Sequence, residues 1–380
     1  MAFAVEHLTS FAELEPHRGF WDANATHRDG DHGFFREFAP CAEGFLRPHV
    51  LRVSRDGATC ALLVGRLARQ RLVIRFGPFG LGAPHLTVLT LVHGGLLGSD
   101  DPDAMRAAFD ALRDLLRRGE ADAVMLHFAP VGHPLTRLVR SGAGRLVRDA
   151  GARPVVLHKA DLARFGADYL RSLSRNAREK QKQRERRLRE AFGDGFRLEE
   201  LRRADDVPRL MDLAERVMRH NYQRGLGVGF RHDETTRRRL LASAARGWLH
   251  GWVVWCGNDP AAFWIADIRG GILHNDFMGY DQRFGRYAPG TWLSVTLFQR
   301  LSRDGSAVRL VDLGVGDASW KSRLATGSEQ VIAAGLFAAR PRPLLVNLLR
   351  GGAAATTELA GWLLDRLGLR EAVRRRLRDS

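Results

Sequence analysis

Cysteine is scarce in this sequence. The three that occur, Cys41, Cys60 and Cys256, are an odd number with no short spacing between them. They therefore predict neither a disulfide framework nor a zinc site. No uncharged stretch approaches the roughly 20 apolar residues that a membrane-spanning helix needs. The first 20 residues lack a basic segment followed by an apolar one, so we expect no signal peptide and a cytoplasmic protein.

Several catalytic signatures are also missing. The motifs HExxH, CxxC and GxSxG and the P-loop lysine motif do not occur, so metalloprotease, zinc, serine-hydrolase and P-loop chemistry have no support. Gly80-Leu81-Gly82 is not followed by the third glycine and the helix that a dinucleotide-binding fold requires. The sequence thus predicts no metal cofactor.

What is abundant is positive charge. The chain has 380 residues, of which 45% are hydrophobic and 27% charged, a balance typical of a globular protein long enough for two domains. Its formal net charge is +16, carried by arginine far more than by lysine. This excess favours association with phosphates, anionic lipids or acidic polymers, although a GC-rich genome that favours arginine codons would produce the same composition.

The most informative stretch runs from Trp248 to Lys321. Runs of β-branched and aromatic residues, separated by turn residues, predict three antiparallel strands at 248–255, 261–268 and 272–280. A glycine-containing basic loop, a helix pattern and a short buried strand at 308–314 follow.

The loop after the third strand is a candidate anion site. Thr291 is a suitable N-cap for the helix that follows it. Helix N-termini attract anions through their free N–H groups and their dipole, and two arginines of the loop add charge there. The predicted donor-binding residues are Gln282, Arg283, Gly285, Arg286, Gly290 and Thr291.

This order of strands, loop, helix and strand resembles the core of the GNAT acyltransferases. Four segments are similar to the CelD/BcsL-like branch, which is linked to cellulose or other polysaccharide production: Tyr280-Asp281, Tyr287 to Gly290, Asp312 to Asp317 and Trp320-Lys321. The chain also resembles the FemAB-type aminoacyl transferases, which carry two GNAT-type units. In layout the resemblance covers most of the chain, and its sharp motifs lie between about Leu173 and Lys321.

The resemblance implies an α/β (α+β) fold of two tandem GNAT-like units, each with a mixed, mainly antiparallel sheet flanked by helices. Residues 1–165 would form a degenerate N-terminal unit and residues 166–380 the catalytic unit. The implied activity is transfer of an acyl group from acetyl-CoA or another acyl-CoA to an amine, such as a sugar or a cell-envelope precursor. The usual loop ends in Gly or Ala where this chain has Tyr287, which leaves aminoacyl-tRNA open as the alternative donor.

The first half repeats the same succession without a residue-level repeat. Apolar patterns predict strands and a helix, and the glycine-rich segment 76–82 predicts a loop. The predicted strands are 49–53, 60–67, 71–76, 123–128 and 154–157, and the helix is 103–118. After Lys321 we expect a final strand pair at 331–338 and 343–348, then a helix at 357–378. The basic end of that helix is a candidate for contact with an anionic membrane.

A strongly basic helix is predicted between residues 167 and 192, with Ser174 as its cap. Basic residues recur every three or four positions, and Arg175 and Arg178 are the candidate substrate contacts. The segment from Ser174 to Arg178 also fits the basic helix that opens the second unit in the resembling families. The helix is either a solvated face with pairs such as Arg175 to Glu179, or a docking stripe for CoA phosphates, tRNA, a nucleotide-linked sugar or lipid headgroups.

Acyl transfer to an amine needs a base for the ammonium proton and an acid for the leaving thiolate. Asp276 and Asp312 are the candidate bases, because a carboxylate in an apolar strand is costly unless it is paired or used. Tyr280 and Tyr287 are candidate acids. Lys321 either pairs with Asp317 or faces the acyl carbonyl or a substrate phosphate.

The acceptor would lie under the polar segment 220–227, which joins two predicted helices. In the resembling fold this segment covers the acceptor, which makes Asn221 and Tyr222 candidate substrate contacts. A hypothesis of another class also remains: a non-catalytic adaptor that uses the basic helix to bind an acidic polymer or a membrane.

Overall fold

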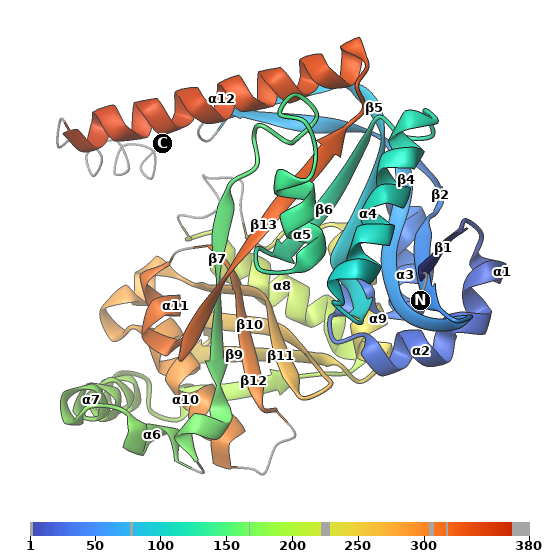
Figure 1. Ribbon diagram of the computed structural model, residues 1–380. Helices are drawn as coiled ribbons and strands as arrows, with labels where there is room; N and C mark the ends of the chain where they lie inside the picture. The colour runs from blue at the N-terminus through green and yellow to red at the C-terminus, as the bar shows by residue number, and fades with distance from the viewer. Residues whose placement is uncertain are drawn as a thin grey trace. The chain divides into compact units, whose positions relative to one another are not determined.

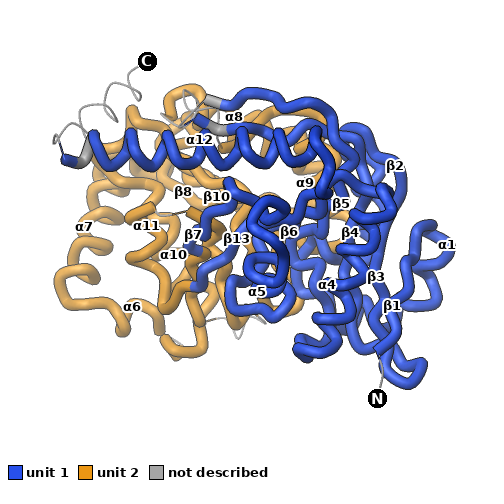
Figure 2. The backbone as a smooth tube through the Cα atoms, turned by 45° about the horizontal axis from the view of Figure 1, so that its top comes forward, with its two compact units in different colours: residues 1–156, 329–370 blue, residues 157–328, 371–380 orange. Residues whose placement is uncertain are grey.

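The computed structural model describes residues 3–76, 79–166, 168–221, 229–303, 308–316 and 318–366. The chain forms two compact units (Figure 2). Unit 1 contains residues 1–156 and 329–370, and unit 2 contains residues 157–328 and 371–380. Both units are mixed α/β structures with a mainly antiparallel sheet flanked by helices, as the sequence predicts (Figure 1).

The sheet of unit 1 has the strand order β1-β3-β4-β5-β6-β13, with β2 paired to β4. Neighbouring strands are antiparallel except β5 and β6, which are parallel over four residue pairs from Val88↔Ala123 to Leu91↔Leu126. The strands are β1 (Phe3–Leu8), β2 (Phe45–Pro48), β3 (Val50–Arg55), β4 (Ala58–Phe76), β5 (Phe79–Gly98), β6 (Ala123–Pro130) and β13 (Gly327–Phe337).

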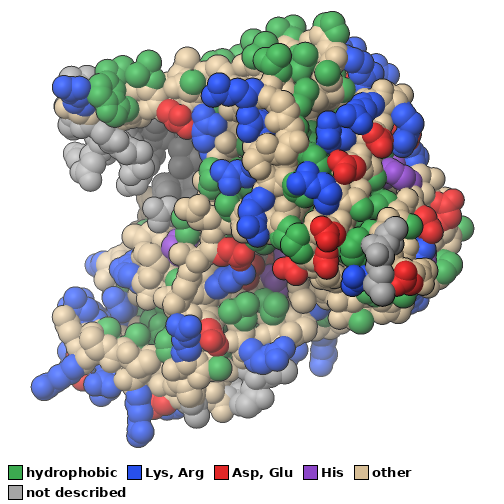
Figure 3. Space-filling view, viewed as in Figure 1, with side chains coloured by type: hydrophobic (Ala, Val, Ile, Leu, Met, Phe, Trp, Pro, Cys, Tyr) green, Lys and Arg blue, Asp and Glu red, His purple; other side chains and the backbone are tan. Residues whose placement is uncertain are grey.

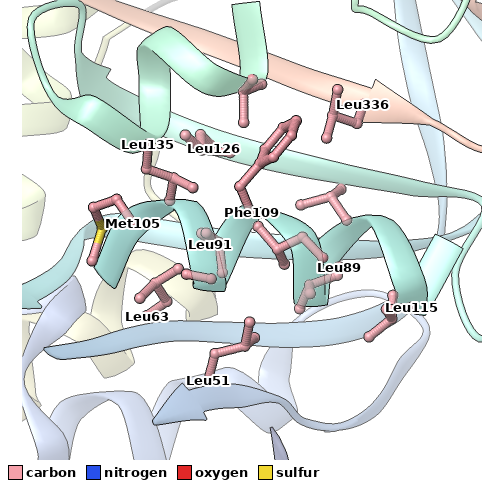
Figure 4. Close-up of a cluster of buried hydrophobic side chains, with 14 of the residues drawn as sticks. Leu51, Leu63, Leu89, Leu91, Met105, Phe109, Leu115, Leu126, Leu135 and Leu336 are labelled. Atoms are coloured by element: carbon pink, nitrogen blue, oxygen red, sulfur yellow. The ribbon is translucent and has the colours of Figure 1, made fainter. Parts of the chain in front are cut away.

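Helix α4 (Pro102–Arg117) packs on one face of this sheet. It begins where the Asp101 side chain accepts the N–H groups of Asp103 and Ala104, and its apolar residues recur at helical spacing. Phe109 is fully buried among leucines of β3, β4, β5 and β6 (Figure 4). The other helices of unit 1 are α1 (Phe11–Leu14), α2 (Arg18–Asn24), α3 (His32–Phe38), α5 (Pro134–Ser141) and α12 (Pro341–Arg366), with the 3₁₀ turns η1 (Glu15–His17), η2 (Arg28–Gly30) and η3 (Ala39–Cys41).

The sheet of unit 2 has the strand order β7-β12-β11-β10-β9-β8. Again one neighbouring pair is parallel: β11 and β12 pair over three positions, from Ile272↔Leu310 to His274↔Asp312. The strands are β7 (Pro154–Asp161), β8 (Arg197–Leu201), β9 (Leu249–Cys256), β10 (Asp259–Arg269), β11 (Ile272–Tyr280) and β12 (Leu310–Val315).

The helices of unit 2 are positioned by ordinary caps and apolar stripes. Ser174 caps α7 as predicted, and the Asp233 side chain caps α9. The helices are α6 (Tyr169–Ser172), α7 (Arg175–Phe192), α8 (Val207–Met218), α9 (Glu234–Ala245), α10 (Pro289–Arg303) and α11 (Ser319–Leu324), with the 3₁₀ turns η4 (Leu162–Phe165), η5 (Gly193–Gly195), η6 (Ala204–Asp206) and η7 (Gln282–Tyr287).

Each unit completes its sheet with a strand from the other half of the chain. β7 follows β6 in sequence but pairs with β12 of unit 2, and β13 follows β12 but pairs with β6 of unit 1. The compact units therefore divide after Val156, and residues 329–370 return to unit 1. This differs from the predicted boundary at 165/166, because local sequence does not reveal which strand a given strand will pair with.

Four local predictions are wrong. Residues 343–348 are not a strand but lie in α12, where prolines occupy the first turn and Val346 packs into the apolar cluster on β4 and β5. The expected break at Arg69-Gln70 does not occur, since β4 continues through it, and β5 begins at Phe79 inside the predicted glycine loop. Thr291 is not the N-cap of α10, because the helix begins at Pro289.

Candidate functional site

The central feature of unit 2 is the point where β11 and β12 stop pairing. Their parallel ladder ends at His274↔Asp312, although β11 continues for six residues to Tyr280. The β10–β11 register also shifts there: Ile265 pairs with Phe277 and Ala266 with Asn275, so Asp276 is the extra residue of a β-bulge. Bulges re-aim side chains and occur often beside active sites. The predicted base Asp276 thus lies, half-buried, where the two strands separate.

A polar cluster surrounds the end of this ladder. We define the β11–β12 cluster as His274, Asn275, Asp312, Gly314 and Lys321. Asp312 is buried, accepts the Gly314 N–H over 2.8 Å, and lies 3.6 Å from Nδ1 of His274. Asn275 donates from Nδ2 to the Leu313 carbonyl over a long 3.4 Å, while its buried Oδ1 has no hydrogen-bond partner among the described residues. Buried polar atoms of this kind are uncommon in folded proteins and cluster at functional sites.

Lys321 enters the cluster from α11. Only 8% of the residue is exposed, and Nζ donates to the Val315 carbonyl over 2.6 Å. Burial lowers the pKa of this ammonium group, and the nearby Asp312 carboxylate offsets part of that shift. Gly314 has φ of +78°, and a Cβ atom built there would lie 3.6 Å from both Lys321 Nζ and Asn275 Nδ2. The backbone at Gly314 therefore passes directly beside these two donors.

The loop η7 is organised by a buried carboxylate. Asp281 is fully buried and caps η7 by accepting the Arg283 N–H over 2.9 Å. Its carboxylate also binds the Arg283 guanidinium over 2.7 Å and faces His220 Nδ1 at 3.2 Å. Burial by itself would raise the pKa of Asp281, but the hydrogen bonds and charges of Arg283 and His220 outweigh it and hold the pKa below its usual value.

The N-terminus of α10 faces the end of β11. Ala288 has φ of +50°, an unusual conformation for a residue with a side chain, and it turns the chain into Pro289 at the first helical position. Among the described residues, no side chain hydrogen-bonds the amides of Gly290 and Thr291. A Cβ atom built on Gly290 would contact Tyr280 at 3.5 Å, so the predicted acid Tyr280 lies next to these free donors. The arrangement suits an anion.

The two loop arginines are less available than the sequence predicts. Arg283 is held by Asp281 and lies 3.9 Å from Asp259. Arg286 stacks over the Tyr287 ring at 4.7 Å and donates to its hydroxyl over 2.7 Å. Tyr287 in turn packs edge-on against Phe192 of α7. Charge at this junction therefore comes chiefly from the helix N-terminus and the exposed Arg286, with Arg283 acting to shape η7.

Comparison with protein families identifies this region. Residues 175–322 match the model of the Acetyltransferase (GNAT) domain. The chain carries a GNAT acyltransferase domain. A search of the curated proteins finds no match to the chain.

Solved structures resemble this chain over most of its length. FemX is 11% identical with a TM-score of 0.54, covering 91% of this chain and all of FemX. The C-terminal domain of a putative lysylphosphatidylglycerol synthetase from Agrobacterium fabrum is 15% identical with a TM-score of 0.50, covering 89% of this chain and 96% of that domain. A tandem GNAT protein from the clavulanic acid pathway is 14% identical with a TM-score of 0.48, covering 89% of this chain and all of that one.

The basic helix α7 opens the GNAT domain. Three residues of its predicted cationic stripe have acidic partners on the same helix: Lys182 with Glu179, Arg186 with Glu190 and Arg189 with Glu185. One alternative predicted that Glu179 pairs with Arg175. Glu179 pairs with Lys182 instead. In the described part of the chain neither Arg175 nor Arg178 has an acidic partner, so the N-terminal turn of α7 keeps its positive charge.

The predicted acceptor contacts are only partly described. Asn221 is buried and donates from Nδ2 to the Tyr280 carbonyl over 3.0 Å, which links it to the end of β11. Tyr222 and Asp317 lie outside the described residues. The GNAT domain thus brings Asn221, Tyr280, Gly285 and Gly290 together at one place and His274, Asn275, Asp312 and Lys321 at another. The sequence-based prediction gives Asn275 no role, since an asparagine beside an aspartate carries no distinguishing pattern.

One group of potential metal ligands exists, and it lies in unit 1. Within the described ranges, single ligand atoms of His27, Asp29 and His93 all lie within 4.8 Å of one another. Nδ1 of His27, however, accepts the Asp29 backbone N–H over 3.1 Å, so the neutral ring carries its proton on Nε2. A ring that binds a metal through Nε2 needs the opposite tautomer, so this hydrogen bond of His27 does not fit a metal ligand.

None of the helices in the described part of the chain combines the length and the apolar character needed to cross a membrane.

Proposed function

We propose that the GNAT domain transfers an acyl group from an acyl-CoA to a primary amine, such as that of a sugar or a cell-envelope or polysaccharide precursor. The observation that carries this proposal is the α10 N-terminus, where the amides of Gly290 and Thr291 lack side-chain partners beside Tyr280. A donor pyrophosphate would bind these N–H groups. The thioester would then extend along β11 beyond its last pair with β12.

The residues at the separation of β11 and β12 suit the chemistry of transfer. The amine nitrogen attacks the thioester carbonyl, the C–N bond forms, and the C–S bond breaks to release CoA thiolate. We assign Asp276 as the base that takes the ammonium proton. Tyr280 lies beside the amides that would bind the pyrophosphate, and the pantetheine arm separates the pyrophosphate from the thiolate. We therefore assign Tyr280 to donor binding, and the thiolate takes its proton from water. Asp312 already accepts the Gly314 N–H and faces His274, which favours a positioning role for it, with Lys321 as a donor near the acyl oxygen.

The first test is donor binding. Isothermal titration with acetyl-CoA and longer acyl-CoAs should show saturable binding, and the bound donor should raise the midpoint of thermal unfolding. Release of free thiol in the presence of an amine panel would then identify the acceptor. If no acyl-CoA binds and none protects against unfolding, the acyl-CoA proposal is wrong.

A second donor, aminoacyl-tRNA, is favoured by two observations. Arg175 and Arg178 begin α7 without acidic partners among the described residues, and Tyr287 stands where the usual loop has a small residue. Binding of tRNA should weaken steeply with salt and should be reduced by Arg175→Glu/Arg178→Glu. The control is Arg186→Glu, because Arg186 already has an acidic neighbour. Equal tRNA affinity in all three proteins would exclude this donor.

A further inference from the structure

Helix α12 presents an apolar face to solvent. We define the α12 apolar face by six exposed side chains: Leu345 (55% exposed), Leu348 (57%), Leu349 (45%), Leu359 (57%), Trp362 (53%) and Leu363 (44%). They recur at spacings of three, four and eleven residues, which places them on one side of the helix. Figure 3 shows hydrophobic side chains gathered at both ends of this helix. Exposed apolar side chains grouped in this way indicate an interaction surface.

The opposite side of α12 is fixed to the rest of unit 1. Asn347 is 1% exposed, donates to the carbonyls of Leu146 and Arg148, and accepts the Ala150 N–H. Arg350 forms a 3.0 Å ion pair with the buried carboxylate of Asp149. Because these polar contacts and the buried Val346 and Ala353 set the rotation of the helix, the α12 apolar face cannot turn inward without breaking them.

Positive charge accompanies this face. Arg342 and Arg366 are exposed on α12, and neither has an acidic partner among the described residues. Arg366 lies over the Trp362 ring at 5.1 Å. The sequence that follows, 367–380, contains five arginines and two acidic residues. An apolar helix face with tryptophan and flanking arginines is the combination that binds the interface of an anionic bilayer.

We propose that α12 docks this protein on the surface of a membrane that contains anionic lipid. Leucine and tryptophan side chains would insert at the headgroup boundary, and the arginines would contact lipid phosphates. A second copy is a poorer occupant, because pairing two such faces would bring together two chains of net charge +16 and their arginine-rich ends. The proposal does not depend on the identity of the acyl donor.

Vesicle flotation tests the proposal with the full-length chain. Vesicles of equal parts phosphatidylglycerol and phosphatidylcholine should bind the protein, and vesicles of phosphatidylcholine alone should bind it at least about tenfold more weakly. The variant Leu359→Gln/Trp362→Gln should reduce binding to the anionic vesicles by about tenfold or more. The matched control Leu46→Gln/Leu146→Gln changes two other exposed leucines, 54% and 65% exposed, and should bind as the unchanged protein does.

Several results would contradict membrane docking by α12. Unchanged binding by the α12 variant, equal binding to both vesicle types, or no binding by the unchanged protein would overturn the proposal. A dimer in light scattering that disappears in Leu359→Gln/Trp362→Gln, without vesicle binding, would also overturn it and would assign the face to a second copy. Circular dichroism and the thermal midpoint confirm that each variant is folded.

Discussion

The sheets of the two units have the same strand order, but the side chains just beyond the parallel ladder differ between them. In unit 1 the order β1-β3-β4-β5, a parallel step to β6 and an antiparallel β13 matches the order β8-β9-β10-β11, a parallel step to β12 and an antiparallel β7 in unit 2. In both, the strand register shifts just after the parallel ladder ends. Because the two units share this strand order, the residues at this point can be compared position by position.

The space next to the ladder is filled in unit 1. In unit 1, His93 lies two residues after the last residue of β5 that pairs with β6. Asp276 holds the corresponding position in unit 2, two residues after His274. The His93 ring packs against Phe128, which has φ of +51°, and against His27 at 4.0 Å between ring centroids. A Cβ atom on Gly94 would lie 2.3 Å from the His27 Cβ. Side chains therefore fill the position in unit 1 that corresponds to the proposed thioester path in unit 2.

The helix that follows also differs. In unit 1 the Asp101 carboxylate accepts the first amides of α4, and Asp100 and Asp103 add negative charge. In unit 2 the first amides of α10 have no such partner in the described residues, and Arg286 is exposed nearby. A helix N-terminus that is capped by its own carboxylate and carries further acidic residues repels an anion. A helix N-terminus whose amides have no side-chain partner attracts one. This difference supports our proposal that the donor binds unit 2 and not unit 1.

The largest expected effect is on catalysis. Asp276→Asn should lower kcat by about 10² to 10⁴ while leaving donor affinity nearly unchanged, because it removes the proposed base. The matched change His93→Gln at the corresponding position of unit 1 should leave kcat within about twofold. Steady-state thiol release measures both. Equal losses in the two variants would contradict the assignment of chemistry to unit 2.

Next in size is the stability of the η7 loop. Asp281→Asn should cost about 3 kcal/mol in the free energy of unfolding, since it leaves the Arg283 guanidinium without its buried partner. The pKa of Asp281 is held below the usual aspartate value of 3.8, so its contribution is complete above that pH. It is lost as the pH falls through the lower folded-state pKa. Urea unfolding at several pH values should therefore show the difference between the two proteins shrinking only in acid.

Donor affinity should respond to a carboxylate placed at the α10 N-terminus. Thr291→Asp adds a negative charge to the first turn of α10, as Asp103 does in α4. It should raise the Kd for acetyl-CoA at least about tenfold, with the thermal midpoint unchanged or slightly higher. Thr291→Ser is the control, since it keeps a neutral hydroxyl. Titration calorimetry that gave the same Kd for all three proteins would place the donor elsewhere.

The smallest expected effect belongs to unit 1. Asp101→Ala removes the cap of α4 and should cost about 1 kcal/mol in the free energy of unfolding. Donor affinity and kcat should not change, because this helix N-terminus binds its own side chain. A change in the Kd for acetyl-CoA would show that unit 1 contributes to donor binding after all.

Most elements of unit 2 could be predicted from the sequence. β11 has the predicted limits, and Ser174 caps α7, because alternation and capping residues act over short distances. The strand prediction for 343–348 is wrong because a short apolar run fits either a strand or a buried helix turn, and tertiary packing of Val346 decides between them. The bulge at Asp276 and the burial of Asp281 depend on neighbouring strands and carry no local pattern.

The sequence alone determined the GNAT-like order of elements and the positions of the basic loop and the basic helix. Only the tertiary structure decided that β7 and β13 complete sheets in opposite units, that Arg283 is held by Asp281, and that Lys321 lies 8% exposed beside Asp312. Strand partners and buried ion pairs join residues far apart in the chain, and their energies depend on burial that short-range patterns do not encode.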